Sequence, residues 1–191
     1  ATAFVRMLEV PGRLDRADGD VHAQGNPHIQ TDPRNYLAVG EALAARLAQL
    51  DPGNAAAYLA GYQRFAGLWR ERIKQWESQA ASLKGVPVVA QHKGWAYLYD
   101  WLGLREVATL EPKPGIEPSD AHLARVREQT MASKPRMVIR AAYNSARPAD
   151  WFAQSSGIPA VILPFTVGAP EAENLTALFD STVQRLLKAT Q

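Results

Sequence analysis

The 191-residue sequence contains no cysteine, which excludes disulfides, thiolate metal ligands and thiol nucleophiles. No apolar run approaches the roughly 20 residues that span a bilayer, so no segment is expected to cross a membrane. The formal net charge of +2 comes without a block of lysines or arginines, which argues against a nucleic-acid surface. Any transition-metal site in this chain must therefore be built from histidines and carboxylates.

Sequence motifs of nucleotide binding and hydrolysis are also missing. There is no GxGxxG or Walker A loop and no HExxH helix, and Ser155-Ser156-Gly157 lacks the G-x-S-x-G frame. A zinc-dependent hydrolase stays open as an alternative function, because an ion with an open coordination position can activate water. An interaction module without metal is a second alternative.

The first part of the chain contains a candidate strand, a loop and a helix. Apolar residues nearly alternate over residues 4–10, which predicts a strand that Pro11-Gly12 ends. The polar stretch that follows, through Asp20, is expected to be a loop. Asp32-Pro33 is typical of a helix N-cap followed by proline in the first turn, and leucines at helical spacing continue to residue 50.

The remainder predicts an α/β fold. Residues 54–83 carry an aromatic-rich stripe at steps of three and four, which favours one long helix with a core-facing side. Short apolar runs over 86–91, 107–110, 137–141 and 160–163 then alternate with helical patterns over 94–102, 118–132, 147–156 and 170–189. Such alternation indicates a parallel sheet covered by helices on both faces, with ligands bound beyond the carboxyl ends of its strands.

Two histidines stand out as candidate metal ligands. His92 follows the first of these strands, and Gly94 leaves room for the backbone there. His28 lies in a loop held between Pro27, which keeps Asn26 extended, and the helix start at Asp32. His22 is close enough in sequence to reach the same ion, although solvation on a loop explains it equally well. Imidazole ligands with few obvious carboxylates favour zinc over manganese.

Several motifs resemble the solute-binding proteins of ABC-type zinc and manganese importers. They are Asn26-Pro27-His28 with Thr31-Asp32-Pro33, Leu50-Asp51-Pro52-Gly53-Asn54 opening the long helix, Gln91-His92-Lys93-Gly94-Trp95, Glu117-Pro118-Ser119, and Val161-Ile162-Leu163-Pro164. They cover nearly the whole chain in the family's order.

The resemblance implies a periplasmic protein, not an enzyme, that binds a metal ion and passes it to the membrane permease of an ABC importer. It implies two α/β lobes joined by one long helix, with residues 1–53 as the remnant of an incomplete amino-terminal lobe, 54–83 as the joining helix and 84–191 as the carboxy-terminal lobe. It assigns His28 and His92 to the metal. An incomplete lobe would also leave a surface open to self-association.

The resemblance has two departures at the metal site. The family's first histidine falls in the part of the amino-terminal lobe that is missing here. Phe165 also stands where the family's late aspartate ligand is expected, after Leu163-Pro164. Glu111 and Asp180 are the candidates for a substitute carboxylate, although a solvated or capping role suits each of them better.

Overall fold

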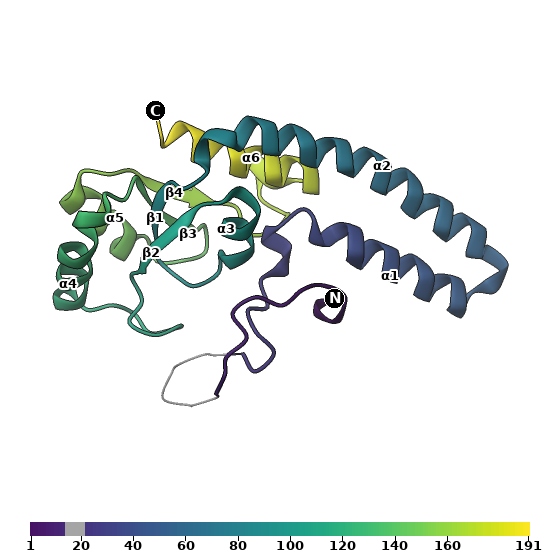
Figure 1. The fold of residues 1–191 in the computed structure, drawn as a ribbon, viewed down its shortest axis with the longest axis horizontal. Helices are drawn as coiled ribbons and strands as arrows, with labels where there is room; N and C mark the ends of the chain where they lie inside the picture. The colour runs from purple at the N-terminus through teal and green to yellow at the C-terminus, as the bar shows by residue number, and fades with distance from the viewer. Residues whose placement is uncertain (14–21) are drawn as a thin grey trace.

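The computed structural model describes residues 1–13 and 22–191 as an α/β fold built on a parallel sheet (Figure 1). The strands are β1 (Pro87–Ala90), β2 (Arg105–Thr109), β3 (Met137–Ala141) and β4 (Ala160–Leu163), in the spatial order β2-β1-β3-β4. All three pairings are parallel. The four predicted strands are confirmed. The central pair, β1 and β3, is almost completely buried, as expected for apolar strands covered on both faces.

Helices cover both faces of the sheet, as predicted. They are α3 (Ala96–Leu102), α4 (Asp120–Thr130), α5 (Ala146–Ser156) and α6 (Leu175–Lys188). Successive strand residues point to opposite faces. Val88 and Ile139 therefore join the core cluster that includes Phe179 of α6, while Val89 and Val138 join a second cluster under α4 and α5.

A hairpin of two helices precedes the sheet. Helix α1 (Asn35–Leu50) lies beside α2 (Ala55–Gln79), and the pair projects away from the sheet (Figure 1). A 3₁₀ turn over Ala80–Leu83 extends α2, so the long predicted helix is confirmed. The aromatic-rich stripe of α2 packs in the core, where Trp69, Ile73 and Trp76 are buried. Leu43 and Leu50 of α1 remain exposed, and self-association through such a surface stays a prediction.

The strand predicted over residues 4–10 is wrong. Thr2–Phe4 forms a 3₁₀ turn, and the following residues pair with loops and helices instead of a strand. The Leu8 N–H donates to Tyr97 Oη at 3.1 Å, and the Leu8 carbonyl accepts from the Asn26 N–H at 2.8 Å. Alternation alone could not make a strand here, because no described strand lies next to this segment to complete a ladder.

Helix α1 has Arg34 at its N-cap with no bond from the Arg34 side chain, and the predicted cap at Asp32 acts two residues earlier, on the turn that leads into the helix. Asp32 Oδ1 accepts from the Arg34 N–H, at 2.8 Å. The loop predicted through Asp20 falls largely outside the described residues. Of the described helices, none is both long enough and apolar enough to span a membrane.

Candidate metal centre

The candidate site lies at the carboxyl edge of the sheet. In a parallel sheet, the residues that follow the strands meet at one edge. His92 follows β1, Glu111 follows β2, Tyr143 follows β3 and Phe165 follows β4. Hydrogen bonds from the Leu110 N–H to the Ala90 carbonyl and from the Glu111 N–H to the Gln91 carbonyl continue the ladder between β1 and β2 toward the site.

Asn26 fixes the loop that carries His28. Its Nδ2 donates to the Lys93 carbonyl at 3.1 Å, which ties the loop to the residue after His92. Its Oδ1 accepts from the His28 N–H at 3.0 Å, and its carbonyl accepts from Tyr97 Oη, also at 3.0 Å. Asn26 is 7% exposed, so these bonds are shielded from water. The buried amide therefore holds His28 beside the end of β1.

The structure brings the predicted histidines together. The ring centroids of His28 and His92 lie 5.9 Å apart, with an angle of 73° between the ring planes. Both residues line a pocket of about 520 Å³, and His22, which is exposed, lines it too. This cavity, which we call the histidine pocket, also has Glu9 and Lys93 in its wall.

Glu111 contacts His92 directly. Its Oε2 lies 2.8 Å from His92 Nδ1 and accepts a second bond, from the Gly115 N–H, also at 2.8 Å. The Glu111 side chain is 13% exposed and that of His92 is 23% exposed. The predicted solvated role is therefore wrong for Glu111, while its bond from the Gly115 N–H agrees with the alternative capping role. The signal available in the sequence was its place directly after the strand predicted over residues 107–110.

Asp180, the other candidate carboxylate, belongs elsewhere. Its Oδ1 accepts the indole N–H of Trp76 at 2.6 Å, which links α6 to α2. It does not line the histidine pocket.

Aromatic rings form one side of the site around Phe165. Its ring centroid lies 5.1 Å from that of His28, 5.0 Å from that of Trp95 and 5.4 Å from that of Tyr143. Burial, and next the negative charge of Glu111, raise the pKa of Tyr143 above its ordinary value. Sequence reasoning did not anticipate this cluster, although Tyr143 and Phe165 both follow strands of the same sheet edge.

The coordinating groups of the pocket are few. Within residues 1–13 and 22–191, no three His, Asp or Glu side chains are placed to hold one ion together. His28 and His92 are thus the two imidazoles whose rings the described chain brings side by side at this pocket. Imidazole nitrogens suit zinc and related ions better than magnesium or calcium, which prefer oxygen.

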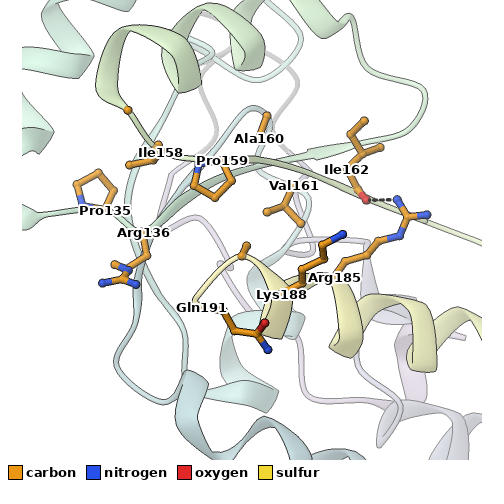
Figure 2. A pocket seen from close by; sticks show the side chains of 12 residues that line it. Pro135, Arg136, Ile158, Pro159, Ala160, Val161, Ile162, Arg185, Lys188 and Gln191 are labelled. Carbon is orange, nitrogen blue, oxygen red and sulfur yellow. Dashed lines mark hydrogen bonds between the residues drawn. The ribbon is translucent and has the colours of Figure 1, made fainter.

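The charged side chains that line a second hollow are all cationic. It lies between the edge strand β4 and the last turns of α6, and Figure 2 shows Arg185 reaching the Ile162 carbonyl there, at 2.9 Å. Arg136, Arg185 and Lys188 line it, and its described lining includes no carboxylate side chain. Cations beside an exposed strand edge discourage pairing with other chains. The three cations of this hollow disfavour a metal ion, whereas the lining of the histidine pocket combines imidazoles with Glu9 and two lysines.

Comparison with known proteins decides the family. A sequence profile described as ZnuA, zinc-uptake complex component A periplasmic, matches residues 3–189. The chain belongs to this family. The predicted resemblance is therefore confirmed over nearly the whole sequence.

The curated relative and the solved structures that match the chain are longer and distant in sequence. The high-affinity zinc uptake system protein ZnuA of Bacillus subtilis (strain 168) is 22% identical over 148 residues, 78% of this chain. That match covers 46% of the relative, so the chain spans about half its length.

Two solved structures share the fold. The cadmium-bound periplasmic metal-binding protein of Candidatus Liberibacter asiaticus matches with a TM-score of 0.79 at 18% identity, covering 100% of this chain and 69% of its own. The manganese complex of FpvC from Pseudomonas aeruginosa gives a TM-score of 0.72 at 22% identity, covering 91% and 69%. The predicted α/β class is thus confirmed.

Proposed function

We propose that this chain is the metal-binding part of an extracytoplasmic receptor that takes up a zinc ion and delivers it to the permease of an ABC importer. The observation that carries the proposal is the approach of His28 and His92, whose ring centroids are 5.9 Å apart on the wall of one pocket. Family membership over residues 3–189 supports the transport role.

Zinc is the proposed cargo because of the donors. His28, His92 and His22 give the pocket three imidazoles. Phe165 packs its ring 5.1 Å from that of His28, and the family resemblance places an aspartate at its position, where a carboxylate would favour manganese. The Bacillus subtilis relative is named as a zinc uptake protein, while FpvC was solved with manganese, so relatives of both kinds exist. The three imidazoles of the pocket favour zinc.

The proposed division of the chain follows from the same site. His28 lies in residues 1–53 and His92 in residues 84–191, and the long helix between them belongs to 54–83. Trp69 of that helix donates to the Pro33 carbonyl at 2.8 Å, and Trp76 donates to Asp180 at 2.6 Å. The helix thus bonds to both parts, which supports its role as a joining strut. A binding role, without catalysis, agrees with the missing hydrolase motifs.

A zinc titration against a chromophoric chelator tests this function. Losing a group that only orients a metal ligand weakens metal binding by roughly 10–100-fold. We expect His28→Ala and His92→Ala each to weaken zinc binding by more than this, because each removes a ligand. His22→Ala tests the third imidazole in the same assay. His122→Ala is the control, because His122 lies in α4, away from the pocket. Wild-type affinity in both His28→Ala and His92→Ala would refute the proposal.

A further inference from the structure

Glu111 contacts only one side of the His92 ring. The ring has two nitrogens, and the carboxylate lies 2.8 Å from Nδ1. An ionised carboxylate accepts hydrogen bonds and cannot donate them, so Nδ1 carries the proton in this contact. A neutral imidazole with its proton on Nδ1 has its lone pair on Nε2, which is then the nitrogen able to bind a metal.

We infer that Glu111 is the positioning residue of the cargo site: it selects the Nδ1–H tautomer of His92 and directs Nε2 to the ion. The inference rests on the proposed function, because it assumes that His92 is a ligand. Outer carboxylates that accept from a metal-binding histidine fix its tautomer and orientation and raise its basicity.

The structure holds Glu111 in place from two directions. Its backbone N–H donates to the Gln91 carbonyl at 3.1 Å, so its main chain is tied to the residue before His92. Its Oε2 also accepts from the Gly115 N–H at 2.8 Å. Gly115 has φ of +81°, a left-handed conformation that glycine adopts without strain. The turn through Pro112 and Pro114 therefore returns an amide to the same oxygen that His92 uses.

A role for Glu111 as a direct ligand fits the geometry less well. Oε2 already serves His92 and Gly115, and the Nδ1 contact lies on a different side of the ring from Nε2. His28, His92 and Glu111 also do not form a three-ligand group in the described part of the chain. A position behind His92, outside the shell of metal ligands, accounts both for the short contact with Nδ1 and for the two hydrogen bonds that Oε2 accepts.

The test compares two substitutions of similar shape. Glu111→Leu removes the acceptor, and Glu111→Gln keeps an acceptor oxygen but removes the charge. Long-range ¹H–¹⁵N NMR of the metal-free protein reads the His92 tautomer, with the signal assigned through His92→Ala. Chelator competition reads zinc affinity. Glu117→Gln is the matched control, an exposed glutamate farther along the same loop. Circular dichroism verifies that each variant is folded.

We expect wild type, Glu117→Gln and Glu111→Gln to show the Nδ1–H form. In Glu111→Leu we expect a mixture of tautomers and zinc binding weakened about 10–100-fold, with a smaller loss in Glu111→Gln. An unchanged tautomer in Glu111→Leu would overturn the inference. So would an equal loss of affinity in Glu111→Gln and Glu111→Leu, because it would make Glu111 a ligand. A wild type that binds no zinc would refute the proposed function, and the tautomer would still decide the role of Glu111.

Discussion

The indole Nε1–H of Trp69 donates a hydrogen bond to the Pro33 carbonyl at 2.8 Å. This bond joins the long helix α2 to the segment that follows His28, and Trp69 is only 4% exposed. Substitution Trp69→Phe removes this donor while the Tyr36 N–H still donates to the same carbonyl at 3.3 Å, so we expect the free energy of unfolding to fall by about 1 kcal/mol. Urea unfolding measures the change.

The neighbouring Leu68 provides the control for Trp69. It is 75% exposed on the same helix, so Leu68→Ala should change the free energy of unfolding by no more than about 0.5 kcal/mol. Equal stability of Trp69→Phe and wild type would show that the bond to Pro33 does not hold α2 to the site segment.

Gly94 lies where Phe165 and His92 come closest to the backbone. A Cβ added there would meet Phe165 Cε2 at 3.2 Å and His92 Cδ2 at 3.4 Å. Gly94→Ala should therefore push one or both rings aside and weaken zinc binding by about 10-fold, the low end of the effect of disturbing a ligand's surroundings. Chelator competition measures this change.

Gly67→Ala is the matched control for Gly94. No heavy atom lies within 4 Å of its added Cβ, and it sits inside α2, so alanine should stabilise the helix by about 0.5–1 kcal/mol. Its zinc affinity should equal that of wild type. If Gly94→Ala also bound zinc like wild type, the close approach of the rings would have no part in holding the ion.

Asp32 and Arg34 form a pair whose effect on stability depends on pH. Burial raises the pKa of Asp32 above its ordinary 3.8, although bonds from Arg34 oppose the shift. A raised pKa means that the folded state favours the protonated acid over the carboxylate. The contribution of Asp32 to the free energy of unfolding is therefore full below about pH 4 and is lost as the pH rises through the pKa of Asp32 in the folded state. Arg34→Gln removes the opposing cation and should cost more stability at pH 7 than at pH 4.

For Arg34→Gln at pH 7 we expect the free energy of unfolding to fall by about 2 kcal/mol. This loss is smaller than the roughly 3–5 kcal/mol for a fully buried pair, because the Arg34 side chain is 40% exposed. Arg6→Gln is the control within the same network, since Arg6 shares Asp100 with Arg34 but has 78% of its side chain exposed and should change stability little. Denaturant unfolding at both pH values measures the difference. An equal loss of stability at pH 4 and pH 7 would contradict the prediction that Arg34 stabilises the ionised form of Asp32.

Local pattern was enough to predict most of the fold. Strands β3 and β4 coincide with the apolar runs over 137–141 and 160–163, because buried parallel strands need continuous apolar side chains. The stripe through Trp69, Ile73 and Trp76 likewise predicted a core helix. The strand predicted over residues 4–10 is wrong because a strand must pair with a neighbouring strand, and local pattern does not reveal whether such a neighbour exists.

The site was predictable only in part, for a related reason. His28 and His92 could be named from their loops and from the family motifs. The contact between Glu111 and His92 depends on β2 lying beside β1 in the sheet order, which sequence reasoning did not establish. The ring cluster of Trp95, Tyr143 and Phe165 likewise draws residues from separate strand ends.

The central claim is that one zinc ion is held by His28 and His92 together. The most direct measurement is anomalous diffraction at the zinc edge from crystals of the zinc-loaded protein. We predict a single strong peak in the histidine pocket, about 2.0–2.1 Å from a ring nitrogen of each of the two histidines. A peak bound elsewhere on the chain, or no peak beside these two rings in the presence of zinc, would contradict the account.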